Sequence, residues 1–329
     1  MRWPTSPWHP QASHAGGGDF FEGWYYKLVS AAGNSRWAII PGISMGATSH
    51  AFVQFLDGAT GQTHYYRYPL SDFRASRRWL DVRIGESRFT ESGVTLDLED
   101  DALRVTGKVS FDAWTPWPIR PWSPGAMGPF GLVPGMQCYH GVLSFDHCLQ
   151  GSMEINGRSV SLDGGRGYTE KDWGRSFPAA WIWMQSNHWS RAHRSFMLSL
   201  ARIPWLGRAF LGVVVGCWES ERLVRIATYT GARLRHVAIR NDHVALRIDE
   251  PRPFGRGYRL EVDAQLGRRG ALRGPVDGAM SMRVPESLDG EICLRLIRMR
   301  KGREEVLWND RGRYAGIEVG GCPDLLYYP

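Results

Sequence analysis

A short run of charged and aromatic residues near the middle of the chain carries groups suited to acid–base chemistry. Residues 168–178 read Tyr-Thr-Glu-Lys-Asp-Trp-Gly-Arg-Ser-Phe-Pro. If residues 170–172 are extended, Glu170 and Asp172 share one face and Lys171 points to the other. A carboxyl group that is buried against the indole of Trp173 would stay protonated and could act as a general acid, and Asp172 is slightly favoured because it adjoins that residue. A solvated salt-bridge cluster is the alternative interpretation.

A second run of the same kind lies near the start of the chain. Residues 20–27 read Phe-Phe-Glu-Gly-Trp-Tyr-Tyr-Lys, which places Glu22 beside Trp24 and Tyr25. The chain has only four lysines, and two of them, Lys27 and Lys171, fall in these two runs. This indicates that lysine is needed at both places.

A third group combines indole rings with amides. On a strand, Trp181 and Trp183 would share one face with Gln185 and Asn187, because successive side chains alternate. Buried amides need hydrogen-bond partners. The pattern fits either an aromatic core with satisfied amides or an apolar pocket with a few convergent polar groups, which is typical of a ligand site.

Metal and disulfide sites are not expected. Neither His140 with His147 nor His188 with His193 has a helical spacing or a carboxylate at a metal-site spacing. The five cysteines are odd in number and form no C-x-x-C pair.

The elements that must position these groups read as short strands. Residues 243–249 and 258–264 alternate apolar and polar side chains, as strands with one buried face do. No helix is predicted beyond a short turn near residues 204–210. About twenty strands with turn signals between them favour antiparallel barrels or sandwiches over strand–helix folds. The other strand candidates are residues 36–40, 50–56, 63–68, 79–84, 94–98, 103–111, 139–145, 158–162, 180–186, 195–201, 211–218, 223–229, 234–239, 280–283, 292–298, 304–308 and 314–319.

Residues 112–136 stand apart because they hold six prolines together with Trp114, Trp117 and Trp122. Proline cannot donate to a sheet ladder, so this segment is not a central strand. It is also too aromatic for a solvated linker. It therefore covers a core, lines a pocket entrance or touches a membrane.

The composition sets further limits. The chain has 329 residues, is 43% hydrophobic and has a mean hydropathy of −0.32, which excludes intrinsic disorder and a transmembrane helix. Residues 1–10 lack an apolar stretch, so no signal peptide is expected and the protein is expected to be cytoplasmic. The net charge of +7 comes from scattered arginines, which indicate a solvated basic surface or attraction to anionic lipid. No nucleic-acid motif is present, so no nucleic-acid partner is expected.

Several of these motifs together resemble the tocopherol cyclase family. The resemblance rests on residues 20–27, on Ile-Pro-Gly-Ile at 40–43 with His-Ala-Phe-Val-Gln at 50–54, on Cys-Tyr-His-Gly-Val-Leu-Ser at 138–144, and on residues 168–187. The motifs occur in the family's order over most of the first two-thirds of the chain. We expect no plastid transit segment of the kind that the plant members carry, so the sequence resembles a bacterial member.

The resemblance implies an all-β fold of two lipocalin-like antiparallel β-barrels or sandwiches in tandem. We expect an N-terminal domain at residues 1–163, including the segment 112–136, and a C-terminal domain at residues 164–329. It also implies a cofactor-independent isomerase or lyase that forms a chromanol ring, the ring system of vitamin E, from a lipophilic prenylated phenol or quinol. Such a substrate would be delivered from lipid, which leaves peripheral membrane contact open.

Residues take expected roles from this resemblance and from their chemistry. An alkene is protonated, and the phenol oxygen captures the resulting tertiary cation. The expected catalytic residues are Asp172, Glu170, Tyr168 and His140. The expected substrate-binding residues are Glu22, Trp24, Tyr25, Lys171, Trp173, Trp181, Trp183, Gln185 and Asn187, with the indoles stabilising the cation.

Two other functions remain open. A hydratase would protonate an isoprenoid alkene and let water capture the cation. A lipocalin-like carrier would bind an apolar ligand without catalysis, with Glu22, Glu170 and Asp172 all salt-bridged at the rim. Fold analogy alone does not separate these functions.

Overall fold

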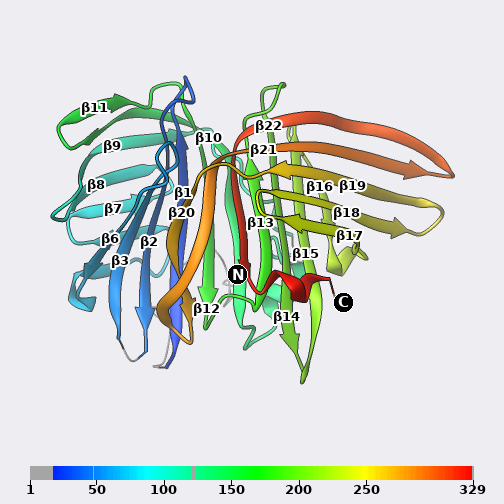
Figure 1. Ribbon diagram of the computed structural model, residues 1–329, viewed down its shortest axis with the longest axis horizontal. Coiled ribbons are helices and arrows are strands. Elements are labelled where there is room, and N and C mark those ends of the chain that lie inside the picture. The colour runs from blue at the N-terminus through cyan, green and yellow to red at the C-terminus, as the bar shows by residue number, and fades with distance from the viewer. Residues whose placement is uncertain (1–17, 47, 121–122, 328–329) are drawn as a thin grey trace. The chain divides into compact units, whose positions relative to one another are not determined.

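A computed structural model describes residues 18–46, 48–120 and 123–327. These residues form two antiparallel sheets linked by turns and short 3-10 helices (Figure 1), which confirms the predicted all-β class. Among them, no helix is long and apolar enough to cross a membrane. Trp122 and the expectation about a signal peptide both lie outside the described residues.

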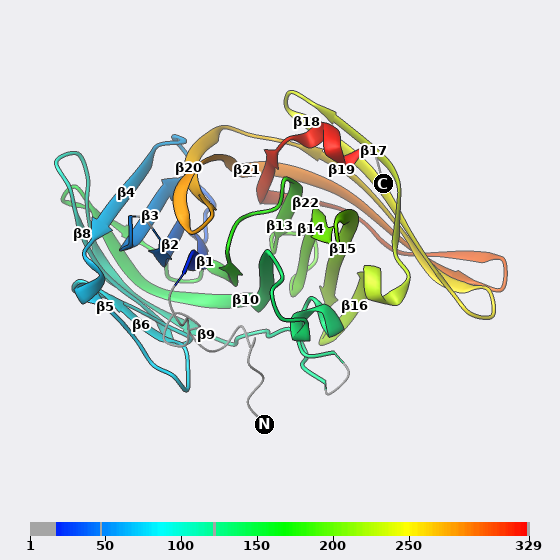
Figure 2. The same ribbon diagram turned by 90° about the horizontal axis from the view of Figure 1, so that it is seen from below.

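The first sheet has twelve strands, in the order β4-β3-β2-β1-β12-β10-β9-β8-β7-β6-β5, with β11 paired to β10. Figure 2 shows that this sheet is strongly curved. The strands are β1 (Phe20–Val29), β2 (Arg36–Met45), β3 (His50–Asp57), β4 (Thr63–Tyr68), β5 (Phe73–Ala75), β6 (Asp81–Ile84), β7 (Ser87–Thr90), β8 (Gly93–Glu99), β9 (Arg104–Asp112), β10 (Cys138–Ile155), β11 (Arg158–Ser161) and β12 (Arg166–Gly174).

The second sheet has ten strands, in the order β16-β15-β14-β13-β22-β21-β19-β18-β17, with β20 paired to β21. The strands are β13 (Ala180–Ser186), β14 (Arg194–Trp205), β15 (Arg208–Glu219), β16 (Arg222–Ala227), β17 (Arg233–Arg240), β18 (His243–Arg252), β19 (Arg256–Gln265), β20 (Arg269–Val276), β21 (Ala279–Arg300) and β22 (Arg303–Gly321). The 3-10 helices are η2 (Leu70–Asp72), η3 (Gly128–Leu132), η4 (Thr228–Thr230) and η5 (Pro323–Leu326).

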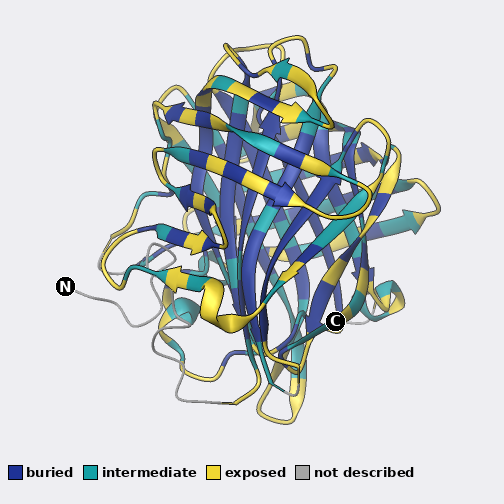
Figure 3. Ribbon diagram, turned by 90° about the vertical axis from the view of Figure 1, so that its left-hand side faces the viewer, coloured by how far each residue is buried: buried dark blue, intermediate teal, exposed yellow. Residues whose placement is uncertain are grey.

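Alternating burial shows why these segments are strands. Within β18 and β19, Val244, Leu246, Leu260 and Val262 are buried, while the residues between them are more exposed. Burying one face of each strand removes apolar surface from water, which is the main stabilising contribution to the fold. Figure 3 shows the same division, with buried strands and exposed turns.

Each sheet carries its own hydrophobic core. Trp24, Tyr26 and Ile39 belong to the core of the first sheet, and Ile182 and Met184 belong to that of the second. The turn predicted near residues 204–210 is the reversal between β14 and β15.

The chain divides into two compact units. The first contains residues 1–177 and 270–283, and the second contains residues 178–269 and 284–329. The sequence-based boundary between residues 163 and 164 does not coincide with this division, because β12 pairs with β1 and β10 of the first sheet.

The proline- and tryptophan-rich segment packs on β10. Trp117 is 2% exposed and stacks on Phe145 with ring centroids 5.4 Å apart, and Trp114 stacks on His147 at 5.1 Å. Of the three roles considered for this segment, the described tryptophans fit the covering of a core.

Candidate functional site

Three neighbouring strands of the first unit carry most of the predicted site residues. β12 lies between β1 and β10, and it places Glu170 opposite Tyr25 and Asp172 opposite His140. The run 168–174 is therefore extended, which meets the condition set for the sequence-based placement: Glu170 and Asp172 lie on one face and Lys171 on the other.

An imidazole and two carboxylates meet on that first face. The Nδ1 atom of His140 lies 2.9 Å from Oδ1 of Asp172, and its Nε2 atom lies 3.7 Å from Oε2 of Glu170. The hydroxyl of Tyr168 donates a hydrogen bond to Oε2 of Glu170. We call these four residues the His140 cluster. They are the four residues predicted to be catalytic.

Burial controls the protonation of groups in and beside this cluster. Burial, together with the adjacent Glu170 carboxylate, raises the pKa of the Tyr168 phenol well above its usual value. Burial, with added contributions from Asp172 and Glu170, likewise raises the pKa of the Cys138 thiol. Both groups therefore stay protonated near neutral pH, and the Tyr168 hydroxyl remains a donor to Glu170.

The two carboxyl groups of the cluster differ in exposure. The Glu170 side chain is 5% exposed, while that of Asp172 is 25% exposed. Removal from water favours the neutral form of a carboxyl group. An imidazole can carry a proton on either nitrogen, so His140 can exchange protons with an acceptor on each side. The arrangement can therefore donate, accept and relay protons.

Three residues of the His140 cluster could also hold a metal ion. His140, Glu170 and Asp172 each offer one ligand atom, and these atoms lie within 4.8 Å of one another. The sequence predicted no metal site because no carboxylate stood at a suitable spacing along the chain. Pairing of β10 with β12 supplies two carboxylates to His140, and spacing along the chain could not reveal this.

The opposite face of β12 carries a buried ion pair. The Nζ atom of Lys171 lies 2.5 Å from Oε1 of Glu22, and neither side chain is exposed. The ammonium lies 5.1 Å from the ring centroid of Trp24 and 4.6 Å from that of Trp173. Burial lowers the pKa of Lys171, although the charge of Glu22 opposes the shift.

This packing corrects the environment expected for Trp173. The sequence suggested contact between its indole and Asp172, but adjacent residues on a strand point to opposite faces. The indole instead stacks on Tyr139, with ring centroids 5.4 Å apart, and contacts the ammonium of Lys171. Trp24 and Trp173 thus stabilise a cation that belongs to the protein itself.

Two residues of the run 20–27 lie on the face of the His140 cluster. The ring of Tyr25 meets that of Tyr168 edge-on, with centroids 6.5 Å apart. Lys27 is fully buried and lies opposite Tyr168 in the register of β1 and β12. Both lysines highlighted by the sequence are therefore buried.

The second unit holds the third predicted group. Trp181 and Trp183 alternate with the core residues Ile182 and Met184, which confirms that the indoles share the other face of β13. The indole Nε1–H of Trp181 donates to Oε2 of Glu318 at 2.9 Å. Gln185 and Asn187 are also buried.

Sequence reasoning missed two carboxylates in this unit. Glu318 lies opposite Trp183 on one side and opposite Glu286 on the other. Glu286 is fully buried. Like charges in directly opposite positions destabilise a sheet, so this pairing is a candidate proton-binding site. Only strand pairing brings these residues together, and neither lies in a motif.

Comparisons with known proteins identify the same family as the sequence motifs. A profile described as tocopherol cyclase-like matches residues 134–321. A probable chloroplastic tocopherol cyclase of Oryza sativa subsp. japonica is 24% identical over 189 residues, which span 53% of this chain and 37% of that protein. The chain therefore matches well under half of its plant relative.

Solved structures share the fold. The structure of CghA has a TM-score of 0.56 at 10% identity, over 93% of this chain and 89% of that one. Kievitone hydratase from Nectria haematococca has a TM-score of 0.50 at 13% identity, over 98% and 93%. At such identities the likeness concerns the fold alone. The family profile spans more than half of the chain and includes the His140 cluster, and the protein therefore belongs to the tocopherol cyclase-like family.

Proposed function

We propose that this protein closes a chromanol ring on a prenylated hydroquinone. The proposal is supported by membership of the tocopherol cyclase-like family, and one structural observation carries it: a buried carboxyl group hydrogen-bonded to a phenol and linked through an imidazole to a second carboxylate. Such a group of residues can deliver one proton and take back another within one catalytic cycle.

The reaction is an isomerisation. A proton adds to the alkene carbon that leaves a tertiary cation, and the phenol oxygen attacks that cation to form the ether bond. The phenol proton then leaves to a base. One proton is consumed and one released, so the reaction needs no oxidant, reductant or other co-reactant.

We assign Glu170 as the proton donor, because its side chain is the more deeply buried of the two carboxyl groups. His140 and Asp172 accept the phenol proton and return it to Glu170. This revises the slight preference for Asp172, which rested on a contact with Trp173 that β12 does not make. Positioning the phenol beside the alkene would contribute further, since intramolecular reactions gain about 7–11 kcal/mol from orientation.

The test is anaerobic incubation of the purified protein with a phytyl-substituted methylbenzoquinol, followed by mass-resolved chromatography. We expect a product of unchanged mass and shifted retention. Glu170→Gln is expected to lower the rate by about 10²–10⁴-fold, because it removes the transferable proton at nearly constant shape. Asp172→Asn is expected to impair proton return and so to lower turnover as well.

Glu154→Gln is the matched control, because Glu154 is an exposed carboxylate on β10 of the same unit. It should leave the rate unchanged. A product heavier by one water would instead identify a hydratase, and bound but unchanged quinol would favour a carrier. Loss of activity with EDTA, restored by a divalent cation, would show that the His140 cluster acts through a metal.

A further inference from the structure

A row of arginines crosses one end of the second sheet. Strand pairing places Arg252 opposite Arg256, Arg256 opposite Arg300, and Arg300 opposite Arg303. Four arginines therefore occupy directly opposed positions on β18, β19, β21 and β22. They lie on the same face of the sheet as Leu260, a core residue farther along β19. We call these four residues the arginine row.

The arginine row is an unfavourable arrangement for the folded protein alone. Like charges in directly opposite positions destabilise a sheet. Arg252 is paired with Glu250. Among residues 18–46, 48–120 and 123–327, no carboxylate lies within salt-bridge distance of Arg256, Arg300 or Arg303. Three arginines with no described carboxylate partner therefore occupy neighbouring, exposed positions on adjacent strands.

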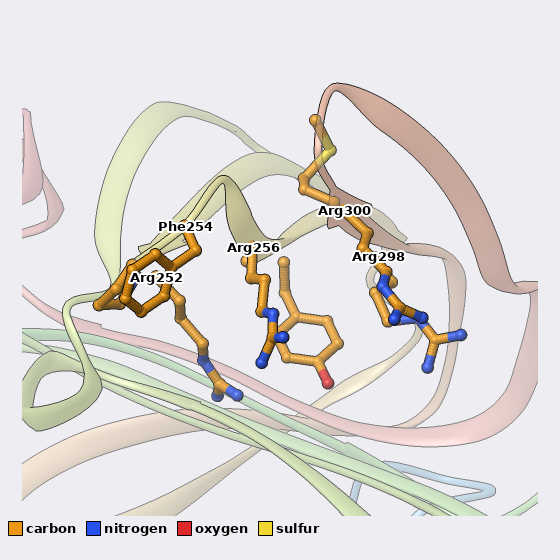
Figure 4. Close-up of a pocket in the computed structure, with 9 residues that line it drawn as sticks. Arg252, Phe254, Arg256, Arg298 and Arg300 are labelled. Atoms are coloured by element: carbon orange, nitrogen blue, oxygen red, sulfur yellow. The ribbon is translucent and has the colours of Figure 1, made fainter.

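A cavity of about 540 Å³ opens beside this row, lined by Arg252, Pro253, Phe254, Arg256, Gly257, Tyr258, Arg298, Met299 and Arg300. Figure 4 shows the labelled arginines extending from two neighbouring hairpins, with their guanidinium groups toward the same side. Arg298 is paired with Glu305, and Arg252 lies over the ring of Tyr258. The positive charge without a described carboxylate partner is therefore that of Arg256, Arg300 and Arg303.

An exposed aromatic side chain completes the surface. Phe254 lies in the turn between β18 and β19, is 87% exposed, and has a backbone φ of 63°, which bulky residues rarely adopt. Exposing a phenyl ring at a hairpin tip has no benefit for the fold. Aromatic rings next to basic side chains are characteristic of segments that lie in a membrane interface.

We propose that the arginine row and Phe254 form the surface through which the protein binds an anionic lipid bilayer. The arginines would contact lipid phosphates, and Phe254 would enter the boundary between headgroups and acyl chains. Strands lie about 4.8 Å apart, so the row spans about 14 Å. That length exceeds a single phosphate and fits a surface of repeated phosphates.

The experiment measures binding of the full chain to vesicles of phosphatidylcholine alone or with one-third phosphatidylglycerol, by co-sedimentation without substrate. We expect binding only to the anionic vesicles, weakened by salt. Each basic residue near such a surface contributes about fivefold in affinity, so replacing Arg256, Arg300 and Arg303 with Gln should weaken binding about 100-fold. The replacement should not lower stability, since it removes like-charge repulsion.

A matched control uses three exposed arginines of the first unit, Arg74, Arg83 and Arg158, replaced together by Gln. Arg74 and Arg83 are also directly opposed, so the control removes the same charge from a similar setting. We expect it to retain nearly all binding. An equal loss in both triple variants would show a diffuse effect of net charge and would overturn the proposal.

Two turn residues test the apolar contribution. Phe254→Ser should weaken binding about tenfold. Leu206→Ser should have no effect, although Leu206 is 88% exposed in another turn of the same unit. Equal effects of the two substitutions would contradict insertion of Phe254. Calorimetric binding of inorganic phosphate at the arginine row, without vesicle binding, would replace the bilayer by a soluble phosphate ligand and would also overturn the proposal.

Discussion

Glu170 and Lys171 are adjacent in the chain but have different electrostatic partners. Glu170 accepts a hydrogen bond from Tyr168 and lies near His140, while Lys171 forms an ion pair with Glu22 between two indoles. Alternation along β12 separates them. One strand therefore holds a proton-transfer group on one face and a structural cation on the other.

The ion pair of Lys171 and Glu22 is expected to stabilise the fold rather than to carry out chemistry. Lys171→Met leaves the Glu22 carboxylate buried without its cation and should lower the free energy of unfolding by about 3–5 kcal/mol. Adding Glu22→Gln should recover much of this loss, because no unpaired charge then remains. Urea unfolding measures both changes. A double variant no more stable than the single one would contradict this assignment.

At the scale of elements, β1 and β12 show what sequence patterns miss. Residues 20–29 and 166–174 were not among the predicted strands, although they lie at the centre of the first sheet. Both strands are buried on both faces over most of their length. A strand buried on both faces has no alternation to detect, whereas the half-exposed β18 and β19 were found from alternation alone.

The candidate site was predictable only in part, for a related reason. Alternation correctly placed Glu170 and Asp172 on one face. It could not show that β10 brings His140 beside them, or that Glu286 lies opposite Glu318, because pairing between distant strands leaves no mark on local spacing. Adjacency in the chain also misplaced Trp173, whose contacts come from its cross-strand neighbours.

β10 and β12 also bury an imidazole away from the His140 cluster. His147 lies opposite Gly167, where a Cβ atom would come within 2.2 Å of the ring, and its ring lies 4.5 Å from that of Phe111. Burial, aided by the charge of Arg166, lowers the pKa of His147 to about 3. The folded protein therefore keeps this ring neutral.

His147 should make folding stability depend on pH. The unfolded chain protonates this histidine near pH 6.5, whereas the folded protein does so only near pH 3, so stability falls as the pH drops from about 6.5 toward 3. His147→Gln removes this effect. As the pH is lowered from about 6 to 4, the free energy of unfolding of the wild-type protein should fall, relative to that of the variant, by about 1.4 kcal/mol per pH unit. Urea unfolding across that range checks the slope, and a constant difference would contradict the burial of a neutral ring.

At the scale of the whole molecule, the first unit is assembled from two distant parts of the chain. Residues 270–283 belong to the first unit, although they follow residues 178–269, most of the second unit, along the chain. Gln54 on β3 holds this segment through both of its amide atoms, which bond the carbonyl and the N–H of Arg273 at 2.9 and 2.7 Å. The Ser44 hydroxyl donates to the carbonyl of Gly278.

Replacing Gln54 should loosen the returning segment. Gln54→Leu keeps the size of the side chain but leaves two backbone groups of Arg273 unpaired, at a cost of about 1–3 kcal/mol. Hydrogen exchange at the Arg273 amide should accelerate by more than exchange at β8, which lies elsewhere in the first sheet. Uniform acceleration across the unit would indicate global destabilisation instead.

The returning segment also sets an order of events during synthesis. A nascent chain that has emerged from the ribosome as far as Phe177 contains all twelve strands of the first sheet but lacks residues 270–283. At about 5–20 residues per second, translation needs several more seconds to supply them. Until then, the side chains of Gln54 on β3 and Ser44 on β2 lack the partners that Arg273 and Gly278 later supply. Completion of the first unit therefore lags behind synthesis of its twelve strands, and newly made chains should pass through a stage in which this surface is open to chaperones.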